Sequence, residues 1–195
     1  HFGSVFGICV EKGSELRLGD PKRYCKGRYV CAGDRVRDEQ GGVALFNELS
    51  SNPATLDASR AVDAYGCLPG NDVQQSDAEQ AYTQAELGTP KRKSMEGGDA
   101  SSEGGDASSA TDTWVSLPPE LVPPEHRLKY RNPVYPLKLA LYGHPDAGGY
   151  WERHCNRAVQ SSGFEAVEGW PSTFYHPQHR TLLMVYVDDF KMSGP

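Results

Sequence analysis

Alternating apolar and polar stretches divide the chain into short strands and helices. Apolar runs at residues 2–10 and 24–32 flank a break rich in Gly, Asp and Pro, which predicts two antiparallel strands around a loose connection. A second hairpin is predicted where Thr173-Phe174-Tyr175 and the apolar run 182–187 flank the turn-forming segment 176–180. Because the run at 182–187 stays apolar without alternation, we expect a strand that is buried on both faces.

Two longer segments have helical spacing. In the first, we expect Asn52 to cap a helix that has Pro53 at its first position, with Gly66 at its C-terminal cap. The apolar face of this helix, interpreted as core scaffolding, would consist of Ala54, Ala58, Ala61, Val62 and Tyr65. A second helix is predicted over residues 148–160, ended by Gly163 and Phe164, with Trp151, Cys155, Ala158 and Val159 on one face.

Between these helices, a short strand at residues 73–76 leads to Asp77, and residues 78–87 have the composition of a helix start. Two roles for Asp77 are compatible with this pattern. The carboxylate either lies at the lip of a sheet, where a strand gives way to a turn, or caps the helix that follows.

Two other stretches are predicted to be irregular. Residues 91–113 are of low complexity, with segment 96–102 repeated unchanged as 103–109. Gly, Ser and acidic residues bury too little surface to offset the entropy of ordering, so we expect a disordered loop inserted in the domain. The Pro-rich stretch 117–136 is predicted to be an extended connection with turns, with a motif for a Pro-binding partner as the alternative.

Charge modifies this picture. The net charge is −6, which is unfavourable for a protein that must hold nucleic-acid phosphates, although part of the acidic excess lies in residues 91–113. Any binding of nucleic acid must therefore come from local basic patches. The candidate is a basic stretch that serves either as a solvated face or as a phosphate contact: Lys22, Arg23, Lys26, Arg28, Arg35 and Arg37.

The cysteines and histidines add little. Five scattered cysteines with no C-x-x-C pair predict reduced intracellular thiols and neither a disulfide framework nor a zinc site. His176 and His179 form an H-x-x-H, interpreted as surface or turn histidines, with zinc as the alternative. The sequence has no apolar run long enough for a membrane span and no signal-like leader.

The apolar run 182–187 stops at two adjacent carboxylates, Asp188 and Asp189. Two negative charges so close together raise each other's pKa unless a cation neutralises them. Mg²⁺ is typically held by one or two carboxylates, with water and substrate phosphate as the remaining ligands. The pair is therefore either half of a phosphoryl-transfer site or a plain hairpin turn, since Asp is a common turn former.

The string Val185-Tyr186-Val187-Asp188-Asp189 resembles the YxDD box of reverse transcriptases, and residues 190–194 continue as in copia-type LTR retrotransposon polymerases. Four further blocks resemble segments of the same family, in the same order. They are residues 26–30 (the early "K-A-R-L-V"), 73–82 (the first catalytic Asp and an aromatic five residues later), 114–119 ("Y-x-x-x-P-P") and 137–143 leading to 150–153 ("K-x-L-Y-G…W"). Together the five blocks cover most of the chain.

The resemblance implies an α+β fold, a polymerase palm and fingers with a small antiparallel sheet and packed helices, over residues 1–195. It implies RNA-directed DNA polymerase activity by two-metal nucleotidyl transfer on an RNA or DNA template with a primer and dNTP. Asp77, Asp188 and Asp189 would be the catalytic residues and the ligands of Mg²⁺ or Mn²⁺. Tyr82 would lie under the sugar, or be an ordinary buried Tyr. Arg28, Lys26, Tyr142 and Gly143 would contact substrate.

Family members continue into a thumb, an RNase H and, in the polyprotein, an integrase, so the chain resembles an incomplete portion expected to be inactive alone. Its expected location is cytoplasmic, in virus-like particles, or nuclear. One block departs from the pattern: where the family reads close to "Y-G-L-K-Q-S-P-R", this chain has His144 and then Pro145-Asp146-Ala147-Gly148-Gly149 after Tyr142-Gly143. A non-catalytic relic, or a co-opted binding module with the palm fold, is therefore the alternative.

Overall fold

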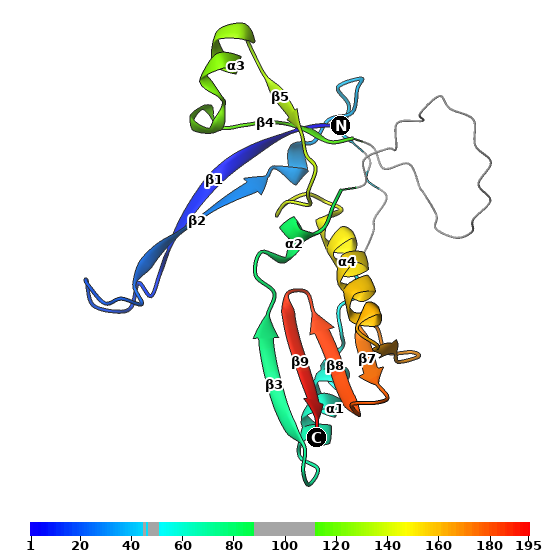
Figure 1. The fold of residues 1–195 in the computed structure, drawn as a ribbon. Helices are drawn as coiled ribbons and strands as arrows, with labels where there is room; N and C mark the ends of the chain where they lie inside the picture. The colour runs from blue at the N-terminus through cyan, green and yellow to red at the C-terminus, as the bar shows by residue number, and fades with distance from the viewer. Residues whose placement is uncertain (45, 47–50, 88–111) are drawn as a thin grey trace, which may run out of the picture. The chain divides into compact units, whose positions relative to one another are not determined.

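The computed structural model describes residues 1–44, 46, 51–87 and 112–195. The chain divides into two compact units, each built from two separated segments: unit 1 is His1–Leu45 with Glu86–His144, and unit 2 is Phe46–Ala85 with Pro145–Pro195. Within the described residues there are two β-sheets and four α-helices, coloured along the chain in Figure 1. The fold is therefore mixed α+β, as the sequence predicts in these coarse terms.

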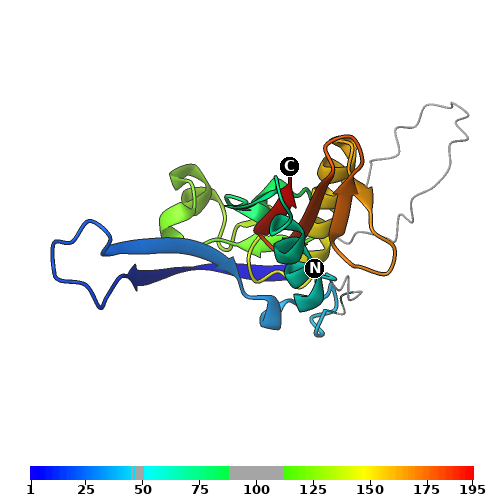
Figure 2. The same cartoon turned by 90° about the horizontal axis from the view of Figure 1, so that it is seen from below.

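Unit 1 contains a four-stranded sheet in the order β2-β1-β4-β5. Its strands are β1 (Phe2–Lys12), β2 (Tyr24–Cys31), β4 (Trp114–Ser116) and β5 (Val134–Pro136). The predicted antiparallel pairing of the first two strands is confirmed, with Val5 opposite Cys31 and Lys12 opposite Tyr24. Strand β4 runs parallel to β1 but pairs only with Phe2, Gly3 and Ser4, so beyond this point β1 and β2 form a two-stranded hairpin, which runs out to a tip loop in Figures 1 and 2.

The core of unit 1 lies where this sheet is widest. Val5, Cys31 and Val115 are buried together, and Leu117, Leu137 and Leu141 pack against them. Short helices complete the unit: the 3₁₀ turns η1 (Gly33–Arg35) and η2 (Pro119–Leu121), and α3 (Pro124–Lys129). The prediction of an extended connection over residues 117–136 is thus wrong in part. Pro119 and Pro124 each begin a helical turn, because the fixed φ of proline suits the first helical position.

Unit 2 contains a five-stranded antiparallel sheet in the order β3-β9-β8-β7-β6. Its strands are β3 (Asp72–Asp77), β6 (Glu165–Ala166), β7 (Thr173–His176), β8 (Thr181–Tyr186) and β9 (Asp189–Gly194). The predicted β7–β8 hairpin is confirmed, with Phe174 opposite Leu183. The described helices of the unit are α1 (Leu56–Gly66), α2 (Ala81–Gln84) and α4 (Ala147–Ser161).

Side chains of β8 alternate between two apolar clusters. Leu183 and Val185 belong to the cluster that contains Trp151, Cys155 and Val159 of α4, together with Phe174 and Ala81. Met184 and Leu182 belong to the cluster that contains Ala58 and Val62 of α1, with Ala54. Successive side chains of a strand point to opposite faces, so α1 and α4 cover opposite faces of the sheet, and β8 is buried on both sides as predicted.

The start of α1 differs from the prediction. Asn52 and Pro53 lie outside the helix, and Thr55 is the N-cap, with its Oγ1 accepting a hydrogen bond of 3.1 Å from the Ala58 N–H. The Ala54 N–H instead donates to the Val185 carbonyl oxygen, which keeps this segment extended along β8. Gly66 is the last helical residue, and Cys67 follows it as the C-cap.

Other helix predictions need smaller corrections. The helix predicted over residues 148–160 is α4, with Trp151, Cys155 and Val159 buried at i, i+4 spacing, but Ala158 is exposed. The helix predicted over residues 78–87 is only the single turn α2, because Leu87 extends instead and donates its N–H to the Lys138 carbonyl oxygen. Most of the loop predicted to be disordered, residues 91–111, lies outside the described residues. Thr113, at its predicted end, is buried.

In the described ranges, every helix is too short or too polar to cross a bilayer.

Candidate functional site

The turn between β8 and β9 consists of two residues, Val187 and Asp188. Val187 has φ of +59°, a left-handed conformation that a β-branched residue rarely adopts and that glycine usually supplies in such tight hairpins. A residue held in this region costs about 1–3 kcal/mol, so the surrounding structure must enforce it. The turn therefore places Asp188 in a fixed position at the expense of local strain.

Two hydrogen bonds hold the strained turn. The Trp151 indole N–H donates to the Val187 carbonyl oxygen at 2.5 Å, which anchors the turn to α4. The Ala78 N–H donates to the Asp188 carbonyl oxygen at 2.8 Å, which anchors it to the residue that follows β3. The backbone carbonyl groups immediately before and between the paired acids are thus tied to α4 and to the residue that follows β3.

Asp77 and Asp189 are direct cross-strand partners in the ladder between β3 and β9. Directly opposed residues project from the same face of a sheet, and both carboxylates line one groove on the face covered by α1. The groove has a volume of about 710 Å³, and Thr55, Ser59, Tyr186 and Lys191 also line it. The structure therefore brings together two of the three predicted catalytic acids.

Asp188 is placed differently from the other two. It is partly buried in the turn, next to Asp189 in the chain, and is not among the residues that line the groove. Over the part of the chain that the structure describes, no set of three or more His, Cys, Asp or Glu side chains is close enough to hold a metal ion. The shared metal site of Asp77, Asp188 and Asp189 stays a prediction, supported by the first and third residues.

Lys191 is a cation that lines the same groove, and it follows Asp189 by two residues on the same face of β9. Its ammonium group is held by α1, at 2.5 Å from Asp63 Oδ1 and 3.3 Å from Ser59 Oγ. The lysine side chain is only 13% exposed. The positive charge of Lys191 is thus balanced mainly by Asp63 and not by the two acids of the groove.

Tyr82 lies on the other side of the sheet. It is partly buried and packs against the cluster that contains Trp151, Cys155 and Val185. It also lines a small cavity with Trp151 and Val187 of the turn. This is the environment expected of an ordinary buried Tyr, and its role beneath a sugar stays a prediction.

The four remaining predicted substrate residues belong to unit 1. Three of them lie together: the Arg28 guanidinium is 5.7 Å from the centre of the Tyr142 ring, and the Cys31 N–H donates to the Tyr142 carbonyl oxygen at 2.7 Å. Gly143 has φ of +83°, and a Cβ there would lie 2.2 Å from the Cys31 carbonyl oxygen, so only glycine fits. Lys26 is exposed on β2, opposite Val10.

The segment 144–149, where the sequence departs from the block that it resembles, has two distinct parts. His144 is buried in unit 1, bonded to Thr113 Oγ1 at 3.2 Å, and burial lowers its pKa to about 4. Asp146 precedes α4 in unit 2, where burial raises its pKa and the nearby Arg153 opposes that rise. His144 is therefore a neutral structural residue, and the carboxylate of Asp146 is not a freely hydrated charge.

The sequence pattern did not identify two residues that shape the site. Trp151 was assigned to the apolar face of a helix, but an indole N–H needs a partner when buried, and that requirement is the signal that it anchors a backbone group. Lys191 was noted only as a residue of the YxDD-like block. His179 lies exposed in the β7–β8 turn, as interpreted, and its N–H donates to His176 Nδ1 at 3.3 Å. The same interpretation is wrong for His176, which is the last residue of β7 and is buried.

Comparisons of the chain with protein-family models, with curated proteins and with solved structures find no match.

Proposed function

We propose that this chain forms the fingers and palm of an RNA-directed DNA polymerase from a copia-type retrotransposon polyprotein. The observation that carries the proposal is the pairing of Asp77 with Asp189 across β3 and β9, beside the turn that holds Asp188. The resemblance assigns these three acids to one site although Asp77 is far from the other two in the sequence. A strand order of β3-β9-β8 with acids at one end of the three strands supports that assignment.

The residues present suit Mg²⁺ or Mn²⁺. These ions prefer carboxylate oxygens and are commonly bound by one or two carboxylates, with substrate phosphates and water completing the shell. Asp77 and Asp189, both exposed on one face, offer such a pair, and Asp188 is the adjacent third donor. When bound, the metal ions would lower the pKa of a primer 3′-hydroxyl and neutralise charge on the triphosphate.

The chain's own contribution to nucleotidyl transfer is positioning and charge. The carboxylates are fixed by the strand ladder and by the clamped turn, so little reorganisation is needed when substrate arrives. In unit 1, Arg28 offers a guanidinium suited to bidentate contact with a phosphate, and this group lies over the Tyr142 ring. The same proposal includes the substrates, which are a template with primer and dNTP. It also includes the rest of a polyprotein as partner and an intracellular place of action.

The alternative function is a non-catalytic relic or co-opted binding module that keeps the same fold. The observation that favours it is the region 144–149, where the family's Lys is replaced by Pro145 and the following Asp146 adds an acid. Loss of a cation near the triphosphate would weaken substrate binding without disturbing the sheet.

The test is primer extension on an RNA template by the parent polyprotein that contains this chain, with Mg²⁺ or Mn²⁺. We expect Asp188→Asn to lower the rate more than a hundredfold, because losing one charged ligand of a two-metal site costs at least about 3 kcal/mol of transition-state stabilisation. Asp57→Asn, which removes a surface carboxylate of α1 paired only loosely with Arg60, is the matched control.

If the parent extends no primer with either metal, the relic is the correct function. If Asp188→Asn extends as fast as the parent, polymerisation is real but the assignment of the site is wrong.

A further inference from the structure

The β1–β2 hairpin of unit 1 carries two exposed thiols, Cys9 and Cys25, on one face. Cys9 is opposite Gly27, and Cys25 is opposite Glu11. The Ala32 N–H donates to the Ser4 carbonyl oxygen, so pair 4–32 is hydrogen-bonded and the odd-numbered pairs occupy the narrow, non-hydrogen-bonded positions. In these positions directly opposed Cα atoms are about 4.5 Å apart, and diagonal neighbours on the same face are about 7–8 Å apart, with their Cβ atoms somewhat closer.

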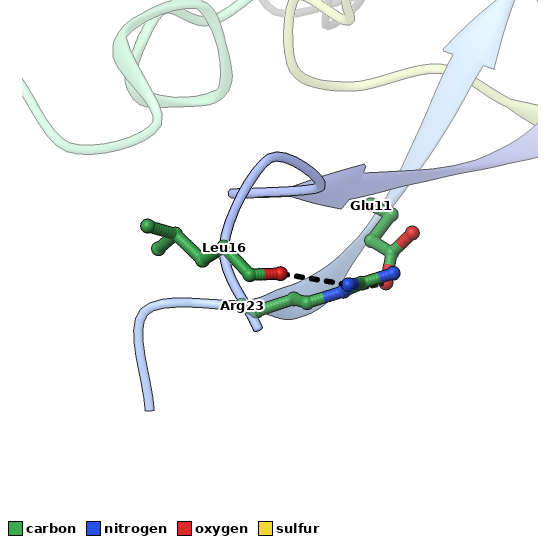
Figure 3. A network of polar contacts seen from close by, with 3 residues as sticks. All are labelled: Glu11, Leu16 and Arg23. Carbon is green, nitrogen blue, oxygen red and sulfur yellow. Dashed lines mark hydrogen bonds and ion pairs between the residues drawn. The ribbon is translucent and has the colours of Figure 1, made fainter. Parts of the chain in front are cut away.

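Cys9 and Cys25 are diagonal neighbours, one pair apart along the ladder. The next diagonal pair toward the loop of the hairpin is Glu11 and Arg23. These two side chains form an ion pair, with Arg23 Nε 2.7 Å from Glu11 Oε1. Figure 3 shows this network, in which the same guanidinium also donates to the Leu16 carbonyl oxygen at 2.8 Å. Arg23 therefore links β1 to the loop of the hairpin immediately beyond the two thiols.

Neighbouring side chains leave room for the thiols to meet. Gly27, opposite Cys9, has no side chain, and a Cβ there would meet nothing within 4 Å. Glu11, opposite Cys25, is drawn toward Arg23. The pKa of Cys25 is raised, chiefly by the charge of the neighbouring Cys9 and by a hydrogen bond with its thiol.

We propose that Cys9 and Cys25 form a dithiol site that glutathione disulfide converts reversibly into a disulfide across the hairpin. A thiolate of one cysteine attacks a sulfur of glutathione disulfide and releases one glutathione thiolate, leaving a mixed disulfide. The second cysteine thiolate attacks the protein sulfur of that mixed disulfide and releases the second glutathione. Two protein thiols are oxidised, one glutathione disulfide is reduced to two glutathione thiols, and the two protons pass to the released thiolates.

The remaining three cysteines provide internal references. Cys31 and Cys155 are buried, and burial raises the pKa of both thiols, to about 11 for Cys155, so they are unreactive near neutral pH. Cys67 is exposed at the end of α1 in unit 2 and reports the reactivity of an accessible thiol outside the hairpin.

The disulfide would fix the pairing of β1 with β2. Lys26 and Arg28 lie in the same part of the hairpin, and their side chains project from its opposite face. The proposal does not depend on polymerase activity, since it rests on the hairpin alone.

The test uses the reduced chain of 195 residues, equilibrated with glutathione buffers of increasing disulfide content, quenched in acid and alkylated. Trypsin cleaves at Lys12, Arg17, Lys22, Arg23 and Lys26, so closure is read by mass spectrometry as a disulfide between peptides 1–12 and 24–26. Since the second thiol acts at high effective concentration, we expect half-closure at a glutathione disulfide concentration at least about tenfold lower than half-modification of Cys67. Closure should also accelerate as pH rises, because the thiolate is the nucleophile.

Cys9→Ser and Cys25→Ser are the matched controls, and each should take up glutathione at its remaining hairpin cysteine only as readily as Cys67 does. Circular dichroism checks that both variants remain folded, and either one suffices for the comparison. The proposal is overturned if wild-type Cys9 and Cys25 are each glutathionylated without the cross-link, or if the cross-link forms at no lower oxidant concentration than the modification of Cys67.

Discussion

The indole N–H of Trp151 donates a 2.5 Å hydrogen bond to the carbonyl oxygen of Val187, the residue of the β8–β9 turn with positive φ. A side chain buried in the core of unit 2 thus reaches the backbone of the turn that carries the paired acids.

Trp151→Phe tests this link, since it keeps an aromatic ring in the core and removes the donor. We expect a loss of about 1–3 kcal/mol in the free energy of unfolding, because the Val187 carbonyl oxygen loses its partner and the smaller ring leaves a gap. Amide hydrogen exchange at Val187 to Asp189 should accelerate more than exchange in β7. Equal changes in the turn segment and in β7 would show that Trp151 supports the sheet generally and not the turn.

The opposed carboxylates Asp77 and Asp189 predict a stability that depends on divalent cations. Without such ions, Asp77→Asn should stabilise the chain by roughly 0.5 kcal/mol, because like charges directly across a ladder repel each other. With Mn²⁺ at about 100 times its dissociation constant, the wild type should gain about 2.7 kcal/mol, and the variant clearly less. Thermal unfolding with and without Mn²⁺ measures both effects. Asp57→Asn is the control, and Mn²⁺ should stabilise it as much as the wild type. If Mn²⁺ stabilises Asp77→Asn by the same amount too, the ion binds elsewhere.

The buried His144 predicts a dependence of stability on pH. Burial lowers the pKa of His144 to about 4, whereas an unfolded histidine titrates near 6.5. Between these values the unfolded chain binds a proton that the folded chain does not, so stability falls as the pH drops from about 6.5 to about 4. The loss of free energy of unfolding attributable to His144 has an upper limit of about 3.4 kcal/mol. Urea unfolding of the wild type and of His144→Gln checks this: the variant's curve should be flatter over that range, and parallel curves would exclude the histidine as the cause.

Gly66, the last residue of α1, predicts a steric effect. A Cβ at this position would lie 2.1 Å from Val73 Cγ2 on β3. Gly66→Ala should therefore destabilise the chain by about 1–3 kcal/mol, although alanine is the better helix former. Adding Val73→Ala should recover part of that loss, whereas the two changes would be additive if the residues did not meet. Gly27→Ala, where a Cβ has open space, is the control and should change stability little.

Elements defined by local pattern were predicted well. The apolar run at 182–187, the hairpin into which it folds and the helix with Trp151, Cys155 and Val159 on one face follow from periodicities of two and 3.6 residues. The boundaries of α1 were not predictable in the same way. Asn52 and Thr55 are both good caps, and the choice between them is made by a backbone hydrogen bond from Ala54 to the distant Val185.

For the candidate site, the sequence predicts that Asp77 and Asp189 lie at strand ends, but not that they face each other. Their register depends on the pairing of β3 with β9, which are separated by most of the length of the chain. A shift of one residue would place Asp77 on the opposite face of the sheet. The strained φ of Val187 was equally unpredictable, since valine disfavours it and only the contacts from Trp151 and Ala78 enforce it.

The position of β9 in the sheet has a consequence for synthesis on the ribosome. Among the strands that the structure describes, β3 is at the edge of the sheet and pairs with β9 alone, yet β9 is the last strand of unit 2 to be translated. While residues 78–188 are being made, the backbone groups of β3 have no partner in the sheet and are open to pairing with other chains. A nascent chain of this protein therefore carries an unpaired strand edge for most of its translation. During this time, chaperones that bind extended segments can bind β3.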